Sequence, residues 1–181
     1  MVYSAVSIAN EFIRLAKDED RPITNMQLQK LPYIAHGWSL ALLDQPLISE
    51  HPKVWQYGPV YPSVYDALKI YGADPIDDYI YDNKWNPFVG QLYGDQFKKG
   101  NIIKANLTDV EKELINTVWN VYKEYDAFQL SALTHQPNTP WSIIKERDGE
   151  GCIIDNETIK KHYLELSARN NNHDSEKQPA K

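Results

Sequence analysis

One segment, residues 24–44, constrains the fold of this chain more than any other, because its helical pattern is apolar on nearly every side. Ile34, Trp38 and Leu42 share one broad face, whereas Leu40 lies on another. Such a helix is usually enclosed by other elements, which shield its several apolar faces from water. We therefore expect a mainly α-helical, compact multi-helix domain around this central helix, with Trp38 and Leu42 buried.

Helical spacing recurs along much of the remaining chain, and capping residues or prolines mark where many of these segments begin. Pro32 lies inside the central pattern, where its missing N–H predicts a kink or a break. The spacing predicts further helices over residues 4–18, 61–71, 109–125 and 127–135, a helix that starts at Pro140, and a last helix that Asp155 caps.

Two segments lack this spacing. Residues 45–60 contain three prolines, and Leu47-Ile48 and Val54-Trp55 indicate two short strands, with Gly58-Pro59 as a turn. Residues 73–106 mix aromatic residues with aspartates and prolines, so we expect an irregular segment that contains one hairpin.

Composition narrows the class of protein. The 181 residues carry 25 acidic side chains against 19 of Lys and Arg, and the net charge of −6 disfavours nonspecific nucleic-acid binding. The single cysteine, Cys152, excludes an intrachain disulfide and fits a reducing compartment. There is no signal-peptide pattern and no apolar run as long as a membrane span. We expect a cytoplasmic protein with one domain, residues 1–168, and a disordered tail, residues 169–181.

Ser131 and His135 are the first candidates for catalysis, because they lie one helical turn apart and their side chains can meet. A nucleophile and base also need an orienting acid and an oxyanion hole, and the sequence shows neither an elbow motif nor an acidic partner. Cys152 has no neighbours that would activate its thiol. We favour local hydrogen bonding for Ser131 and His135 and a structural thiol for Cys152. A hydrolase that uses Ser131 or Cys152 with His135 remains the less favoured alternative.

The five histidines have no paired metal-ligand spacing, and no C-x-x-C pair is present. No G-x-G-x-x-G or P-loop sequence occurs. We therefore expect neither a metal site nor a cofactor.

Lys30 and Gly58-Pro59 remain ambiguous. Lys30 lies at the edge of the apolar central helix, where it can either extend to water or pair with a buried carboxylate or a cluster of carbonyls. Gly58-Pro59 turns the chain sharply, and this favours a structural corner over a direct contact with a partner.

Aromatic residues are dense between residues 57 and 93. Tyr and Trp are favoured at the centres of protein interfaces, although they can equally cover a small core. We take as candidate partner-binding residues Tyr61, Tyr65, Tyr79, Tyr81, Trp85 and Tyr93.

Three segments in this order resemble the Panacea domain family, whose members are also described as SocA-like or GepA-like phage-associated proteins. The segments are Met26-Gln27-Leu28-Gln29-Lys30-Leu31 with Ile34-Ala35-His36-Gly37, then Trp55-Gln56-Tyr57-Gly58-Pro59-Val60-Tyr61-Pro62, then Leu130-Ser131-Ala132-Leu133-Thr134-His135 with Pro140-Trp141. We interpret the motif residues as mostly structural: Lys30, Leu31, Trp55, Tyr57, Gly58, Pro59, Ser131, Thr134, His135 and Trp141.

The resemblance implies a mainly helical antitoxin of bacterial or prophage origin that neutralises its toxin by direct binding. It also implies a toxin partner encoded by a neighbouring gene, and no catalytic activity or cofactor. One kind of member acts as a proteolytic adaptor, so delivery of a toxin to a protease is the alternative. Pro32 departs from the family, which usually has a large apolar residue there. Some members carry an added DNA-binding segment, which we do not expect here because the domain begins almost at residue 1.

Overall fold

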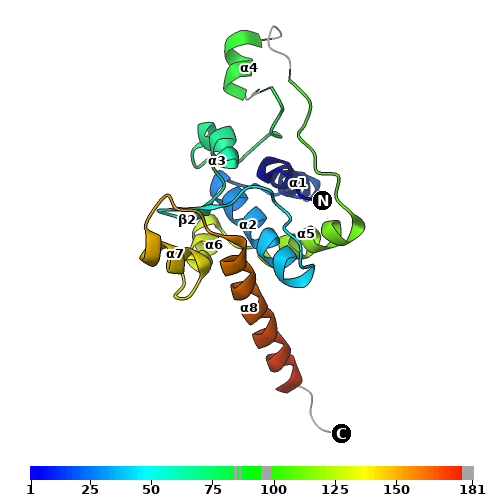
Figure 1. The fold of residues 1–181 in the computed structure, drawn as a ribbon. Helices are drawn as coiled ribbons and strands as arrows, with labels where there is room; N and C mark the ends of the chain where they lie inside the picture. Colours follow the sequence, from blue (N-terminus) through cyan, green and yellow to red (C-terminus); the bar gives the residue numbers. More distant parts are fainter. Residues whose placement is uncertain (84, 86, 95–98, 177–181) are drawn as a thin grey trace.

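The computed structural model describes residues 1–83, 85, 87–94 and 99–176. These residues form α-helices, one short 3-10 helix and a two-stranded antiparallel sheet, so the fold is mainly α, as predicted (Figure 1). The elements in chain order are α1 (Ala5–Asp18), α2 (Asn25–Leu42), β1 (Lys53–Trp55), β2 (Gly58–Val60), α3 (Pro62–Leu68), η1 (Lys69–Tyr71), α4 (Pro87–Tyr93), α5 (Asp109–Tyr122), α6 (Ala127–Thr134), α7 (Pro140–Asp148) and α8 (Asn156–Glu176). None of the helices in the described part combines the length and the apolarity that a membrane crossing requires.

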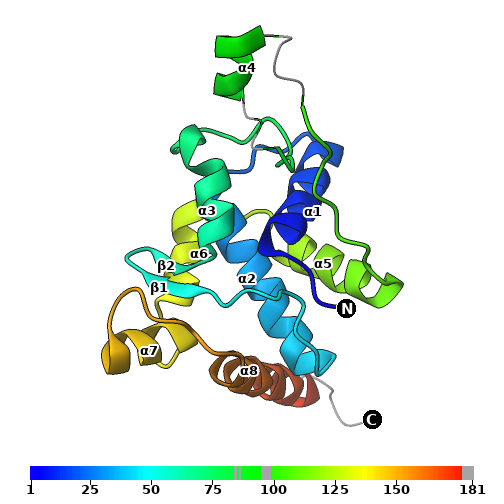
Figure 2. The same ribbon diagram turned by 45° about the horizontal axis from the view of Figure 1, so that its top comes forward.

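Helix α2 is the centre of the fold, which confirms the prediction from its apolar pattern. It contacts α1, α3, α5, α6, α8 and β2, and Figure 2 shows it between α1 and α5 on one side and α3 and α6 on the other. Its side chains are buried from Leu28 to Gly37. The prediction for its last turn is wrong: Trp38 is half-buried and Leu42 is exposed. That turn forms one wall of an apolar groove of 470 Å³ against α5.

Pro32 does not break α2, which continues without interruption to Leu42. One missing N–H inside a helix can be tolerated when packing on all sides holds the helix in place. Packing is close at Gly37, where an added Cβ would lie 2.2 Å from the ring of Tyr163 in α8. The absence of a side chain at Gly37 thus allows α8 to approach α2.

The predicted starting points of the helices are confirmed in detail. The side chains of Ser4, Thr24, Thr108, Asp126 and Thr139 each accept a hydrogen bond from a backbone N–H in the first turn that follows. Three of these ends are full capping boxes, in which a glutamine or glutamate returns a bond to the capping residue. Local polar signals therefore fixed these boundaries.

The strand prediction is half right. Val54-Trp55 lies in β1, which pairs with β2 at Gly58–Val60, whereas Leu47-Ile48 forms no strand. Gln56 and Tyr57 form the turn, and Gly58, with φ of 103°, begins β2 instead of ending the hairpin. Ile48 instead makes an isolated parallel bridge to Tyr3.

The described residues between 81 and 102 (81–83, 85, 87–94 and 99–102) belong to an arm in which α4 lies away from the other helices, as both ribbon views show (Figures 1 and 2). A bridge between Tyr81 and Ile102 closes its base. The buried amide of Asn10 in α1 donates to the carbonyl oxygens of Ile80 (2.9 Å) and Ile103 (2.8 Å). The sequence predicted a hairpin in this segment but not its helix, because seven residues around Gly90 give too little periodicity to detect.

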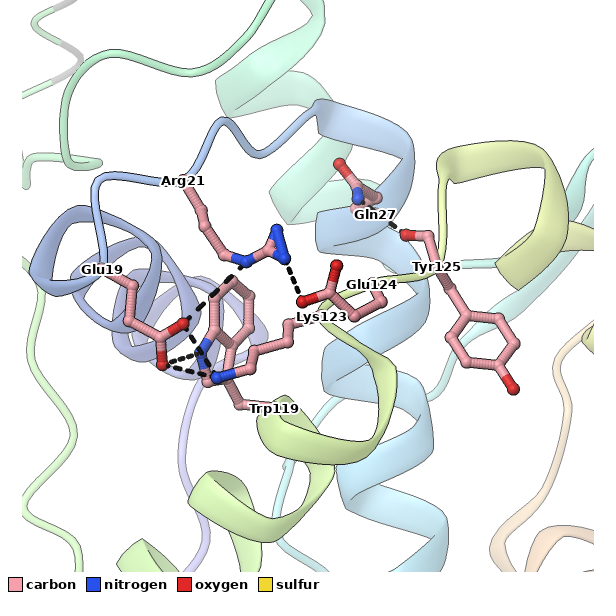
Figure 3. A network of polar contacts seen from close by, with 7 residues as sticks. All are labelled: Glu19, Arg21, Gln27, Trp119, Lys123, Glu124 and Tyr125. Carbon is pink, nitrogen blue, oxygen red and sulfur yellow. Dashed lines mark hydrogen bonds and ion pairs between the residues drawn. The ribbon is translucent and has the colours of Figure 1, made fainter.

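A polar network joins the connection between α1 and α2 to the connection between α5 and α6 (Figure 3). The Glu19 carboxylate accepts bonds from the Trp119 indole (3.0 Å) and from Lys123 (2.9 Å), and hydrogen bonding to Lys123 lowers the pKa of Glu19. Arg21 pairs with Glu124 in the same network. The network holds two turns together that are about a hundred residues apart in sequence.

Helix α8 is described to Glu176, so it includes residues 169–176, which we predicted to be disordered. Adding residues to an existing helix needs no buried face, because each new residue gains a backbone hydrogen bond. Residues 177–181 of the predicted tail lie outside the described residues, and the domain boundary stays a prediction.

Candidate functional site

The three motif segments meet at the hairpin turn, residues 55–59. Four carbonyl oxygens of this turn are each contacted by a side chain from another motif segment. Trp141 Nε1 donates to Trp55 O (2.9 Å), His135 Nε2 lies 3.1 Å from Gln56 O, Ser131 Oγ donates to Tyr57 O (3.0 Å) and Lys30 Nζ donates to Pro59 O (3.0 Å). The motif residues thus position one turn, which stands against α2 and α6.

Lys30 is turned inward, which decides between the two positions that the sequence allowed. The side chain is 1% exposed, and burial lowers the pKa of Lys30 from its usual 10.5 to about 7. Among the described residues no carboxylate lies within salt-bridge distance of its Nζ, and Pro59 O accepts its hydrogen bond. Lys30 is therefore a buried amine with donors to spare, since an ammonium carries three N–H groups.

Two features require glycine at position 58: the conformation of its backbone and the lack of space for a side chain. Its φ of 103° falls in a region that side chains disfavour, and an added Cβ would lie 2.6 Å from Lys30 Nζ and from Thr134 Oγ1. Thr134 Oγ1 donates to Ser131 O (2.8 Å), which ties the end of α6 to this contact. The turn and the buried amine are thus packed against each other directly.

The side chains of Ser131 and His135 lie close together, but their hydrogen bonds are not those of a nucleophile–base pair. The Ser131 hydroxyl gives its proton to Tyr57 O, and its Oγ lies 3.4 Å from His135 Nδ1. His135 Nδ1 lies nearer to Ser131 O (2.6 Å), and Nε2 faces Gln56 O. When Nδ1 carries the ring proton it donates to Ser131 O, and it then cannot accept a proton from the Ser131 hydroxyl.

The other candidates for chemistry are also accounted for by local contacts. Cys152 Sγ donates to Asp148 O (3.2 Å). No three His, Cys, Asp or Glu side chains come together in a metal-binding group within the part of the chain that the structure describes.

The candidate partner-binding residues divide into three sets. Tyr61 is fully buried, so in this structure it presents no surface to a partner. Tyr65 in α3 is partly exposed and packs edge-on against Trp55, with ring centroids 4.9 Å apart. The remaining four lie on or next to the arm.

Three of those four form the base of the arm. Tyr81 and Trp85 pack edge-on, with ring centroids 5.4 Å apart, and Lys99 Nζ lies 4.2 Å from the centre of the Trp85 ring. Tyr81 also donates to Asp78 (2.7 Å), and that bond raises the pKa of Tyr81 after the larger effect of burial. Tyr79 is half-buried beneath Lys17. These aromatics stabilise the arm, and their contact with a partner stays a prediction.

The exposed apolar surface of the arm is on α4. Phe88, Leu92 and Tyr93 are 53%, 61% and 59% exposed. Phe88 and Leu92 are four residues apart and share one face of the helix. Tyr93 was a candidate from the sequence, whereas Leu92 was missed because an isolated leucine carries no interface signal.

A second surface feature adjoins the hairpin turn. A cavity of 330 Å³ opens between α2, the turn and α3, and Lys30, Trp55, Tyr57 and Tyr65 are among its lining residues. The lining also includes Met26 and Gln29, which belong to the first motif segment but were not among the candidate partner-binding residues. Only the folded chain brings these residues around one space.

Comparisons with known proteins agree with this convergence of motifs. The chain matches the family described as "Antitoxin SocA-like, Panacea domain" over residues 28–142, which include the three motif segments except Met26 and Gln27. It is 31% identical over 165 residues to "Antitoxin SocA" of Caulobacter vibrioides (strain NA1000 / CB15N), covering 88% of this chain and 81% of that protein. No solved structure matches it. The chain therefore belongs to the SocA-like antitoxin family that is defined by the Panacea domain.

Proposed function

We propose that this chain is an antitoxin that neutralises a toxin protein by direct contact, and that the exposed face of α4 makes part of that contact. The observation that carries the proposal is the position of Phe88, Leu92 and Tyr93 at the end of an arm, outside the packed helices. Large apolar side chains on such a projection give a partner contact area, and covering them does not disturb the packing of the other helices.

The proposal assigns no catalytic step to the chain. Ser131 and His135 direct their polar atoms at carbonyl oxygens of the protein itself, and two of these contacts, to Tyr57 O and Gln56 O, support the hairpin turn. A binding function needs only a rigid scaffold that presents a surface, which the central packing around α2 provides.

Net charge adds a preference for the partner. A charge of −6 speeds the diffusional association of this chain with a basic protein at low salt. A basic net charge is common among toxins that act on nucleic acids or membranes. We expect the toxin to be encoded by a neighbouring gene and to carry a net positive charge.

Co-expression with the product of the neighbouring gene tests the proposal. Wild type should restore growth and co-purify with the toxin. The triple variant Phe88→Ser, Leu92→Ser and Tyr93→Ser should stay folded and lose both properties, since removing one anchor typically costs about 2 kcal/mol of binding. The matched control Phe128→Ser with Leu164→Ser removes exposed apolar side chains from α6 and α8 and should behave as wild type.

Two results would contradict the proposal. Full rescue by the triple variant would move the contact away from α4, and the absence of any complex would argue against direct neutralisation. Inhibition of the purified toxin in a reaction without proteases distinguishes direct neutralisation from the adaptor alternative, which requires a protease to remove the toxin.

A further inference from the structure

The buried amine of Lys30 has hydrogen-bonding capacity that the free chain does not use. Its Nζ donates to Pro59 O (3.0 Å), whereas an ammonium has three N–H groups. No carboxylate among the described residues neutralises it. Buried polar groups are normally satisfied, so an amine that lacks a counter-charge points to a group supplied from outside the chain.

The cavity beside the turn gives access to this amine. Lys30 lines the cavity and is almost fully buried, so it lies at the closed end. Tyr57 also lines it and is 57% exposed, so it lies at the mouth. A volume of 330 Å³ accommodates one or two side chains and is too small for a packed helix.

The walls define the chemistry of the occupant. Trp55 and Tyr65 pack edge-on along one side, and Met26 contributes a flexible apolar surface. A side chain that enters must be apolar along its stem and negatively charged at its end. Aspartate and glutamate have this form, and a carboxylate in a buried site is strongly attracted to an ammonium.

We propose that this cavity receives an acidic side chain of the toxin, whose carboxylate accepts hydrogen bonds from Lys30 Nζ while Trp55, Tyr57 and Tyr65 surround its stem. The inference rests on the proposed function and adds a second contact, on a different face from α4. It also gives the motif residues a role in recognition, because the bonds from Ser131, His135 and Trp141 fix the turn that forms one wall.

The experiment measures the affinity of the purified chain for its neighbouring toxin by calorimetry. Lys30→Met keeps an unbranched side chain that is one atom shorter and removes the charge, and it should weaken binding at least about 30-fold, as expected when one partner of a buried charge pair is lost. Tyr57→Ser alters the mouth without touching the buried amine and should weaken binding several-fold. Lys104→Met removes an exposed lysine as the matched control and should bind as wild type.

A double-mutant cycle identifies the toxin residue. One Asp→Asn or Glu→Gln change in the toxin should reproduce the loss, and combining it with Lys30→Met should cause no further loss. Wild-type affinity for both Lys30→Met and Tyr57→Ser would overturn the inference, and so would the lack of any acidic toxin residue that couples to Lys30. These outcomes leave the proposed function intact, whereas failure of the wild type to bind the toxin refutes the proposed function itself.

Discussion

Replacing Lys30 by methionine should change how the stability of the protein depends on pH. Burial lowers the pKa of Lys30 to about 7, whereas an unfolded chain restores its usual 10.5. Between these values the unfolded state binds more protons, so the stability of wild type rises as pH rises. Below pH 7 both states are protonated, and the folded state bears the full cost of burying the charge.

The magnitude follows from the two pKa values. Each pH unit between them corresponds to about 1.4 kcal/mol, so the full cost is about 5 kcal/mol at pH 6.5. Lys30→Met removes this cost and loses the hydrogen bond to Pro59 O, which is about 1 kcal/mol. The variant should therefore be more stable than wild type by about 4 kcal/mol at pH 6.5, and the difference should nearly vanish by pH 9.5.

Urea unfolding followed by circular dichroism at pH 6.5, 8 and 9.5 measures this difference. The other titrating groups are common to both proteins and cancel in the comparison. Measurements stop at pH 9.5 because burial raises the pKa of Tyr33 and Tyr163, so both proteins lose stability at higher pH as these tyrosines ionise in the unfolded state. Lys104→Met should keep the wild-type profile. A difference that stays constant from pH 6.5 to 9.5 would refute the reasoning.

Three further substitutions test the packing. Gly58→Ala should lower the free energy of unfolding by about 2 kcal/mol or more in urea titration, because its Cβ would clash with Lys30 Nζ at a positive φ; an unchanged value would contradict this contact. Gly37→Ala should lower the free energy of unfolding by about 3 kcal/mol, and with it the melting temperature, because its Cβ would clash with the ring of Tyr163. A neutral effect would mean that α8 packs less closely against α2. His135→Ala should lower the free energy of unfolding, measured by urea titration, by about 1–2 kcal/mol. An ester- or amide-cleaving activity that wild type has and the variant lacks would contradict a structural role for His135.

The sequence was most informative where local chemistry determines structure. Capping residues such as Thr108 and Asp126 form hydrogen bonds within one turn, so four residues contain the whole signal. The central position of α2 was also predictable, because a helix that is apolar on several sides must be enclosed.

Features that depend on distant contacts were not predictable. Leu42 has the same local pattern as buried residues of α2, but it lies 60% exposed in the groove between α2 and α5. Gly58-Pro59 carries a turn signal, yet its pairing with β1 places it in a strand. The environment of Lys30 depends on Pro59 and Thr134, which the sequence places 29 and 104 positions away. Motif residues could be named from the sequence, but their meeting at one turn required the fold.

The closed base of the arm has a consequence for how such proteins diversify. Because Tyr81 and Ile102 are paired, the chain leaves and re-enters the body at nearly the same point. A segment with adjacent ends can be exchanged for one of different length at a small entropic cost, about 0.6 kcal/mol for each doubling of loop length. Recombination that replaces the residues between this pair would supply a new contact surface in one step and leave the packing around α2 untouched.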